Sequence, residues 1–299
     1  MALIEETFEG YRDKVYTAMG RLKTFEPPEG YWVSMSGGKD SRCIYHLCKM
    51  AGVKFDAHYV VTAVDPPELM RFVRDYYPDV TWERHYWNDD KPEHHYKDGR
   101  PKQMTMWNLI SSYAMPPTRH VRYCCTAFKE RSGAGRVVVT GVRWEESNNR
   151  RELHGVADIQ TESTKLRSQA KGVPLSKENR KGGIIFLEDN RQARQMVEQC
   201  YAKNKTTINP IIDWTEEDVW EFLNERVKVP HCELYDQGLT RIGCVGCPLQ
   251  SPKGMRRDFE RWPKYRELYI RAFDKMLLNR KDGTFSNGNE VLEDWIRRA

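Results

Sequence analysis

Glycines and hydroxyl side chains gather in one short segment, Ser36-Gly-Gly-Lys-Asp-Ser41, which follows the apolar residues Tyr31-Trp-Val33. Gly37 and Gly38 allow positive φ angles and close approach of the backbone, and free N–H groups at the start of a following helix attract anions. Lys39 adds a mobile positive charge. The segment therefore predicts a strand, a glycine turn and a helix start that together bind phosphate. A capped Gly-Gly turn without a ligand is the alternative.

Four of the eight cysteines form two close pairs, Cys124-Cys125 and Cys244-Val-Gly-Cys247. In tetrahedral zinc sites the ligands usually follow a C-x-x-C spacing, and two neighbouring cysteines turn poorly to one ion. A 4Fe-4S cluster has separate iron corners, which an adjacent pair can serve. The pattern favours a cluster, with zinc and reduced structural thiols as the alternatives. The nearby basic residues that would balance a negatively charged cluster are Arg119, His120, Arg122, Lys129 and Arg241.

Length and composition indicate a globular protein. The chain has 299 residues and a formal net charge of +5, from 48 basic and 43 acidic residues. No run of apolar residues is long enough to cross a membrane, and the acidic start Met1-Ala-Leu-Ile-Glu-Glu6 lacks the regions of a secretory signal. We therefore expect a cytoplasmic protein without a membrane partner. The mild net charge does not by itself predict a polyanionic partner.

Hydrophobic periodicity predicts a leading helix over residues 5–22, followed by alternating strands and helices. The expected strands are residues 31–35, 55–62, 80–85 and 136–141, and the expected helices between them are residues 42–51 and 66–77. The last strand is short and continuously apolar, which is typical of a central parallel strand. The alternation predicts an α/β fold with a doubly wound, mostly parallel sheet that binds ligands at the carboxyl ends of its strands. We expect the Ser36 loop and the loop of residues 141–143 to face one such site.

Two basic regions bear on a possible polyanionic partner. Residues 165–181 contain six basic residues and one acid, together with glycine and proline, and predict a flexible loop. This loop either follows a phosphate backbone or is a solvated insertion. Residues 255–275 alternate basic and apolar side chains at helical spacing, so we expect one amphipathic helix packed on the domain despite Pro263, with a nucleic-acid surface as the alternative.

The Ser36–Ser41 segment resembles the PP-loop of ATP pyrophosphatases. Three further segments resemble motifs of the phosphoadenosine-phosphosulfate (PAPS) reductase family: Val139-Thr-Gly-Val-Arg-Trp-Glu-Glu-Ser-Asn-Asn-Arg150, Asn209-Pro-Ile-Ile-Asp-Trp-Thr-Glu-Glu-Asp-Val-Trp220 and Tyr235-Asp-Gln-Gly-Leu-Thr-Arg-Ile-Gly-Cys-Val-Gly-Cys-Pro248. The four motifs occur in family order over about residues 31 to 250. The resemblance implies an adenine nucleotide alpha hydrolase-like fold. We expect a leading helix and linker over residues 1–28, a nucleotide domain with the cluster ligands over 29–250, and a helical C-terminal extension over 251–299. The C-terminal part of the fold is expected to be helical and to bear the cluster.

The resemblance also implies roles for single residues. The expected nucleotide-binding residues are Ser34, Met35, Ser36, Gly37, Gly38, Lys39, Asp40, Ser41, Thr62, Gly141 and Arg143. The candidate catalytic residues are Lys39, Asp40, Arg143, Glu146 and Arg150. Asp40 would cap the helix or position Mg²⁺, and Arg143 and Arg150 would neutralise charge at phosphorus. Glu146 and Ser147 would orient Arg143 or contact ribose. Alternatively, Arg143 and Arg150 are buried partners of Glu146 and Glu152.

The two cysteine pairs resemble those of adenosine-phosphosulfate (APS) reductases, in which four thiolates hold a 4Fe-4S cluster. By this resemblance Cys124, Cys125, Cys244 and Cys247 are the ligands. Reductases of the family carry a nucleophilic cysteine in a C-terminal tail, whereas the last cysteine here is Cys247. Cys232 would be either a persulfide carrier or a packing thiol.

The absence of that cysteine favours ATP chemistry, as in the iron–sulfur ATP pyrophosphatases of DNA phosphorothioation (Dnd/Ssp type). Such an enzyme would adenylate a DNA phosphate, release pyrophosphate and then AMP, and depend on a cysteine desulfurase or another sulfur donor and on further subunits. An APS or PAPS reductase with an external or displaced thiol is the alternative. A tRNA thiolation enzyme and a nucleotide-binding subunit without turnover are further possibilities.

Overall fold

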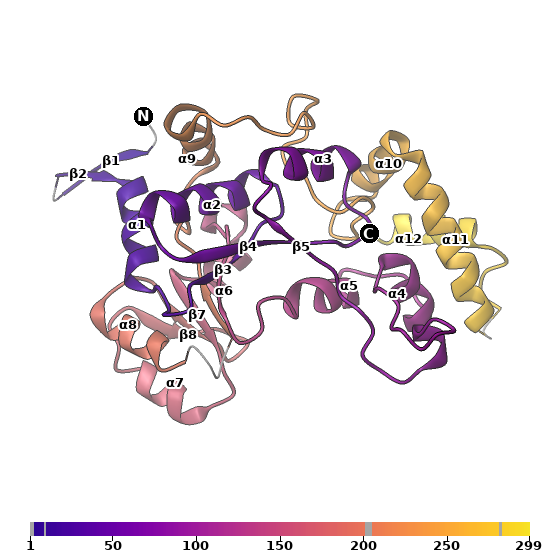
Figure 1. Ribbon diagram of the computed structural model, residues 1–299, viewed down its shortest axis with the longest axis horizontal. Coiled ribbons are helices and arrows are strands. Elements are labelled where there is room, and N and C mark those ends of the chain that lie inside the picture. Colours follow the sequence, from indigo (N-terminus) through magenta and orange to yellow (C-terminus); the bar gives the residue numbers. More distant parts are fainter. Residues whose placement is uncertain (1–2, 9, 201–204, 281–282) are drawn as a thin grey trace. The chain divides into compact units, whose positions relative to one another are not determined.

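The computed structural model describes residues 3–8, 10–200, 205–280 and 283–299. The chain forms two compact units, each built from separate stretches of sequence (Figure 1). Unit 1 comprises Met1–Tyr59, Phe72–Thr81 and Gly133–Cys232, and unit 2 comprises Val60–Arg71, Trp82–Ser132 and Glu233–Ala299.

An eight-stranded sheet organises the fold. Its strands, in spatial order, are β5 (Thr81–Glu83), β4 (Phe55–Val60), β3 (Tyr31–Ser34), β6 (Val137–Val139), β10 (Lys205–Ile208), β7 (Ala157–Gln160), β9 (Ile184–Phe186) and β8 (Ser176–Glu178). Strands β4, β3, β6 and β10 pair in parallel, whereas β10, β7, β9 and β8 pair antiparallel. All three valines of β6 are buried, as a central strand requires. The α/β fold class is therefore confirmed, and the antiparallel half of the sheet is an addition that the sequence pattern did not predict.

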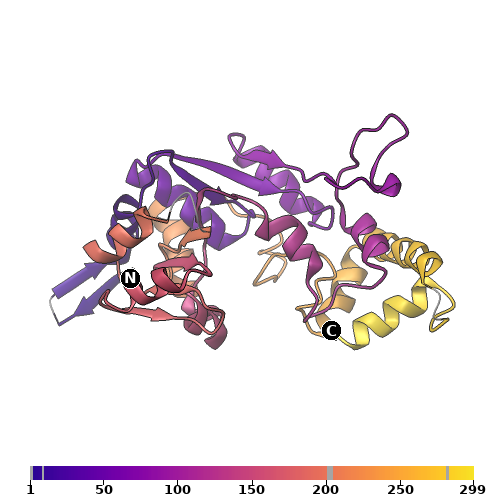
Figure 2. The ribbon, with the colours of Figure 1, turned by 90° about the horizontal axis from the view of Figure 1, so that it is seen from below.

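Helices of unit 1 cover the sheet. They are α1 (Lys14–Thr24), α2 (Lys39–Ala51), α6 (Asn148–Leu153), α7 (Thr164–Ala170), α8 (Arg191–Glu198) and α9 (Glu216–Glu221), with π-helical residues Phe222–Val227 after α9 and a 3₁₀ turn at Trp144–Glu146. Helix α1 packs against α2 (Figure 1), and the same elements are seen from below in Figure 2. Helix α3 (Pro67–Tyr76) follows β4, and its span agrees with the prediction.

The start of the chain differs from the predicted helix over residues 5–22. Strands β1 (Ile4–Thr7) and β2 (Gly10–Asp13) form an antiparallel hairpin, and α1 begins only at Lys14. Gly10 has a φ of 119°, which suits a turn, and the Asp13 side chain accepts hydrogen bonds from the N–H groups of Val15 and Tyr16. This N-cap fixes the helix start at a position that periodicity alone does not reveal.

The flexible loop predicted over residues 165–181 is wrong, because this region contains most of helix α7 and the edge strand β8. Ser163 caps α7 by accepting a hydrogen bond from the N–H of Leu166. Strand β8 pairs with β9 at the outer edge of the sheet, where the exposed charged side chains of Lys177 and Glu178 discourage pairing with other chains.

Unit 2 is mostly helical. It contains α4 (Met106–Tyr113), α5 (Tyr123–Cys125), α10 (Pro252–Arg261), α11 (Pro263–Asn279) and α12 (Gly288–Arg297), with a 3₁₀ turn at Pro92–His94 and a π-helical turn at Thr126–Glu130. The single amphipathic helix predicted over residues 255–275 is two helices, because Pro263 has no N–H to continue α10 and instead begins α11. Helix α11 packs on α4 and α12 through Tyr269, Phe273 and Trp295. None of the helices within the described residues is long and apolar enough to cross a membrane.

Asp213 fastens α1 to the segment before α9. Its carboxylate accepts hydrogen bonds from Arg21 at 2.8 and 2.9 Å and from Arg12 at 2.6 Å. Burial raises the pKa of Asp213, but the guanidinium groups of Arg21 and Arg12 outweigh it and hold the pKa below its usual value. The family-like motif around Asp213 therefore has a structural role in unit 1.

We expect Asp213→Asn to lower the free energy of unfolding by about 3 kcal/mol at neutral pH, because it leaves the buried Arg21 without its anionic partner. Since the folded pKa is lowered, this stabilisation is present above the unfolded pKa of about 3.9 and is lost as the pH falls below it. Urea unfolding of both proteins at neutral and acidic pH measures the difference. A gap that does not narrow in acid would contradict the assignment.

Candidate functional site

The predicted strand, glycine turn and helix start are present in unit 1. Strand β3 ends at Ser34, Gly37 has a φ of 77°, and the extended Gly38 is the N-cap of α2. The N-cap Gly38 has no side chain that could cap α2, and the positive end of the helix dipole at this turn favours an anion. The Ser36 hydroxyl donates to the Ser41 hydroxyl at 3.1 Å, and Ser41 donates to the Gly38 carbonyl at 2.9 Å. These bonds tie the loop to the first turn of α2 and fix its backbone.

Arg143 reaches this loop from the segment after β6. It is 2% exposed, and its Nε donates to Asp40 Oδ1 at 2.7 Å while its Nη1 donates to Glu145 Oε2 at 2.7 Å. Burial lowers the pKa of Arg143, but Asp40 and the neighbouring carboxylates outweigh it and raise the pKa, so the guanidinium is charged. The prediction that Asp40 caps α2 is therefore wrong. The N-cap is Gly38, and Asp40 instead holds Arg143.

Gly141 brings the two loops together. A Cβ atom on Gly141 would lie 2.8 Å from the carbonyl carbon of Asp40 and 2.9 Å from its Cβ. Only glycine allows this contact between the segment after β6 and the first turn of α2. The expectation that the Ser36 loop and residues 141–143 face one site is thus met within unit 1.

Two carboxylates near the loop, Glu145 and Glu216, were missed by the sequence analysis. Glu145 Oε2 accepts a second hydrogen bond, at 2.5 Å, from the backbone N–H of Glu216. The Glu216 side chain lies 3.6 Å from the Nζ of Lys39, which is 4% exposed. Thr215 and Asp218 form a capping box that starts α9 and thereby fixes Glu216, and the T-x-x-D pattern was the available signal.

The other predicted site residues lie in different surroundings. Glu146 accepts a hydrogen bond from the backbone N–H of Arg143 at 3.1 Å, so it orients the chain and not the guanidinium. Ser147 caps α6, and the half-exposed Arg150 lies 3.9 Å from Glu146. The alternative that Arg143 and Arg150 are buried partners of Glu146 and Glu152 is therefore wrong for Arg143, whose partners are Asp40 and Glu145. Arg150 does lie beside Glu146, but its side chain is not buried. Thr62 belongs to unit 2, where its hydroxyl donates to Asp65 at 2.8 Å.

The four paired cysteines line one cavity of about 540 Å³ in unit 2. Cys124 and Cys125 lie at α5, and Cys244 and Cys247 lie in the loop before α10. Gly246 shapes this loop with a φ of 69°, and its N–H donates to Asp258 at 3.0 Å. The other side chains of the cavity wall include Phe128, Lys129, Arg241, Arg257, Arg261, Trp262 and Tyr269.

The cysteines of this cavity and Lys129 shift one another's pKa values. A hydrogen bond from Cys124 lowers the pKa of Cys125, and the same bond raises the pKa of Cys124. Burial raises the pKa of Cys244 to about 11, and the Cys244 thiolate raises the pKa of Lys129. Among the described residues no group of three or more His, Cys, Asp or Glu side chains is placed so that it could hold a metal ion. Four thiols and Lys129 thus line one cavity.

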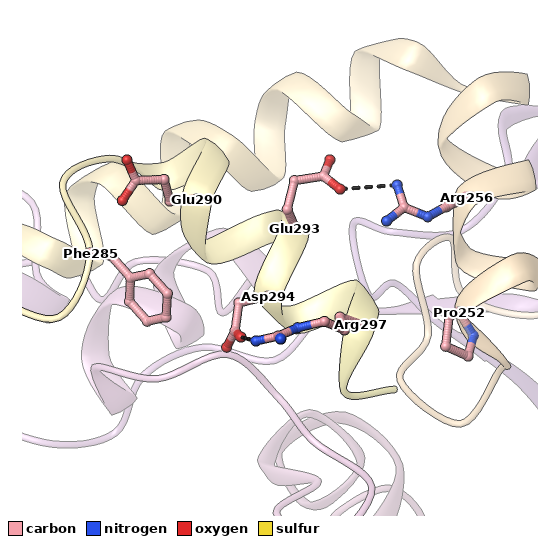
Figure 3. Close-up of a pocket in the computed structure, with 7 residues that line it drawn as sticks. All are labelled: Pro252, Arg256, Phe285, Glu290, Glu293, Asp294 and Arg297. Atoms are coloured by element: carbon pink, nitrogen blue, oxygen red, sulfur yellow. Dashed lines mark hydrogen bonds and ion pairs between the residues drawn. The ribbon is translucent and has the colours of Figure 1, made fainter.

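The other four cysteines and a second hollow are not part of the lining of this cavity. Cys43, Cys48 and Cys232 are buried, which agrees with packing thiols. On unit 2 an open hollow of about 730 Å³ has charged side chains that pair with one another, such as Arg256 with Glu293 at 3.0 Å (Figure 3). Its lining residues are Pro252, Arg256, Phe285, Glu290, Glu293, Asp294 and Arg297.

The eight-stranded sheet, with the glycine turn between β3 and α2, defines an α/β protein. Residues 30–250 match the phosphoadenosine phosphosulfate reductase domain, and the chain therefore belongs to this family.

Relatives of the chain include an uncharacterized protein of Methanocaldococcus jannaschii, which is 24% identical over 269 residues, covering 89% of this chain and 44% of that protein. An adenosine 5'-phosphosulfate reductase of Oceanobacillus iheyensis is 38% identical over 55 residues, covering 18% of this chain and 22% of the enzyme. The chain thus spans less than half the length of these curated relatives.

Two solved structures resemble this chain distantly. The phosphoadenylyl-sulfate reductase of Candida auris, in a phosphate complex, is 15% identical with a TM-score of 0.41 over 76% of this chain and 88% of that chain. The FMN adenylyltransferase of Candida glabrata, in complex with ATP, is 15% identical with a TM-score of 0.38 over 78% of this chain and 61% of that chain.

Proposed function

We propose that the chain is an ATP pyrophosphatase that adenylates a DNA backbone phosphate for sulfur incorporation. The observation that carries the proposal is the buried, charged Arg143, held by Asp40 against the phosphate-binding loop. A fixed guanidinium beside a loop of N–H donors stabilises negative charge that develops at phosphorus, where such groups lower a barrier most.

The proposed reaction has two steps. A non-bridging oxygen of the acceptor phosphate attacks the α-phosphorus of ATP, and the bond from this phosphorus to the bridging oxygen breaks, so that pyrophosphate leaves. A sulfur nucleophile then attacks the phosphorus of the acceptor, and AMP leaves with the former acceptor oxygen. Lys39 and the N–H groups of α2 would bind the leaving pyrophosphate, and Arg143 would contact the α-phosphate.

Carboxylates beside the loop support ATP over a sulfonucleotide. Glu145 and Glu216 have half-exposed side chains next to the buried cations Arg143 and Lys39. Their negative charge would repel phosphates that arrive alone, whereas Mg²⁺ bound to ATP accepts one or two carboxylates together with phosphate oxygens. We therefore propose Mg²⁺–ATP as the substrate.

We further propose that Cys124, Cys125, Cys244 and Cys247 hold a 4Fe-4S cluster. When bound, such a cluster supplies a compact negative charge and crosslinks the segments that carry its ligands. Lys129 would offset its charge, in keeping with the raised pKa of this lysine beside the thiolates. A cysteine desulfurase or another sulfur donor, and further subunits of a sulfuration system, are proposed partners. Their support is the motif resemblance to enzymes of DNA phosphorothioation.

Product analysis tests the reaction. Anaerobically purified protein is incubated with Mg²⁺–ATP, with and without duplex DNA, or with APS or PAPS and a thiol. We expect pyrophosphate from ATP that increases with DNA, and no sulfite. Sulfite from APS or PAPS would instead establish a reductase, the second candidate that the likeness to the Oceanobacillus iheyensis enzyme favours.

Gly141→Ala should weaken the site without touching a functional side chain. The added Cβ would lie 2.8 Å from the backbone of Asp40, so the loop must shift. We expect ATP affinity to fall about tenfold and the protein to lose about 1–3 kcal/mol of stability. Calorimetric titration with ATP measures the first effect and thermal unfolding measures the second.

Gly20→Ala is the matched control, because a Cβ at Gly20 in helix α1 meets nothing within 4 Å. This variant should keep its ATP affinity and gain about 0.5–1 kcal/mol of stability. Equal ATP affinities of the two variants would show that the close approach of Gly141 and Asp40 is irrelevant to binding.

A further inference from the structure

A turn with adjacent basic residues lies at the outer end of the sheet in unit 1. It joins β8 to β9, and its tip is formed by Arg180 and Lys181 (Figure 1 shows β8 beside α7). The Asn179 side chain accepts hydrogen bonds at 2.9 Å from the N–H groups of Lys181 and Gly183, and the Gly182 N–H donates to the Asn179 carbonyl at 2.9 Å. These bonds fix the turn, so both cations are presented on a defined backbone.

The turn is fastened to α6, the helix that follows Arg143. Arg180 donates to the Asn149 side chain, and Asn179 donates to the Leu153 carbonyl at 3.4 Å. Helix α6 adds the exposed Arg151. The segment from Arg143 to Leu153 therefore links the candidate nucleotide site to this turn within one unit.

Helix α7 contributes a fourth cation. A Cβ on Gly182 would lie 3.3 Å from the guanidinium carbon of Arg167, which places this side chain beside the turn. We call Arg151, Arg167, Arg180 and Lys181 the basic turn surface. Two acids lie on the same elements, the exposed Glu152 and Glu178, and Glu178 is 3.4 Å from Arg167. The surface is thus positive in balance.

We infer that the basic turn surface binds the phosphate backbone of duplex DNA. This inference rests on the proposed function, because it names the surface that would hold the acceptor. Fixed cations from a turn and two helices match phosphates, which position a nucleic acid without specifying its sequence. No aromatic residue occurs in residues 150–153 or 167–181, so the surface lacks the stacking groups that bind single strands.

The test is fluorescence anisotropy of a labelled 20-base-pair duplex with the full chain at several salt concentrations, using the triple variant Arg151→Ala/Arg180→Ala/Lys181→Ala. We expect affinity to fall at least tenfold and the slope of log K against log salt to decrease by about 2 to 3, as for the loss of two or three phosphate contacts. Arg167 is left in place because it bonds to Thr161 and Glu178. Unchanged thermal unfolding would show that the variant is folded.

The matched control removes three exposed lysines elsewhere, Lys23→Ala/Lys54→Ala/Lys264→Ala, and should bind the duplex like the unmodified chain. The inference would be overturned if both triple variants lost the same affinity for the duplex, or if the first variant kept its affinity. Tighter binding of tRNA than of the duplex would also overturn it. Anisotropy needs no turnover, so a chain that binds DNA through this surface but releases no pyrophosphate refutes the proposed reaction alone.

Discussion

Replacing Arg143 with alanine should lower the rate of pyrophosphate release about 10²- to 10³-fold, the usual effect of removing a fixed donor from a developing charge. The reason is geometric, because Arg143 is buried and held at 2.7 Å by both Asp40 and Glu145. Its loss also leaves these two carboxylates without their cation beside the phosphate-binding loop. Steady-state measurement of pyrophosphate release at saturating Mg²⁺–ATP gives the effect on kcat.

The control for this variant is Arg194→Ala, which removes an exposed arginine that pairs with Glu198 at 2.8 Å on α8, outside the candidate nucleotide site. Its kcat should match that of the unmodified chain. Arg143→Lys should recover little activity, since an ammonium group cannot keep the fork of bonds to both carboxylates. An Arg143→Ala variant within about threefold of full activity would exclude this arginine from the reaction.

Replacing both Cys124 and Cys125 with serine should abolish iron binding. The two thiols are half of the four proposed ligands that line one cavity, and serine does not replace thiolates as cluster ligands. Because a bound cluster crosslinks its ligand segments, the double variant should also unfold at lower temperature. Iron and acid-labile sulfide analysis after anaerobic purification gives the first result, and calorimetry gives the second.

Cys48→Ala is the control, since Cys48 is a buried thiol of α2 in unit 1. It should retain its iron and sulfide. Stoichiometric zinc in the unmodified chain, or iron that survives the double serine substitution, would contradict a cluster held by these cysteines.

Local patterns predicted the parts of the site that depend on neighbouring residues. The apolar Tyr31-Trp-Val33, followed by Gly37 and Gly38, specifies strand, turn and helix within one short stretch, and the structure agrees. The segment around Arg143 was likewise found from the sequence because its motif is continuous. Propensity and periodicity suffice where the determining contacts are local.

Contacts between distant segments explain what the sequence did not provide. Glu145 and Glu216 lie beside the loop because α9 begins next to the segment that carries Arg143. The two glutamates are 71 residues apart in the chain, so no local pattern connects them. Strands β7 and β9 are short, and α7 and β8 lie between them in the chain, so no hairpin pattern predicts their pairing. Strands β8 and β9 are joined by one turn, but each has three residues, too few to show an alternating pattern of apolar and polar side chains. In the first residues a single cap at Asp13 overrides helical periodicity.

We propose that the loop between β3 and α2 binds ATP. Competitive equilibrium binding of ATP, APS and PAPS to the anaerobically purified chain, with Mg²⁺ present, tests it most directly because binding requires no acceptor or sulfur donor. We predict that ATP binds most tightly and that its affinity falls when Mg²⁺ is removed. Tighter binding of APS or PAPS, unaffected by Mg²⁺, would contradict the pyrophosphatase and indicate a sulfonucleotide reductase.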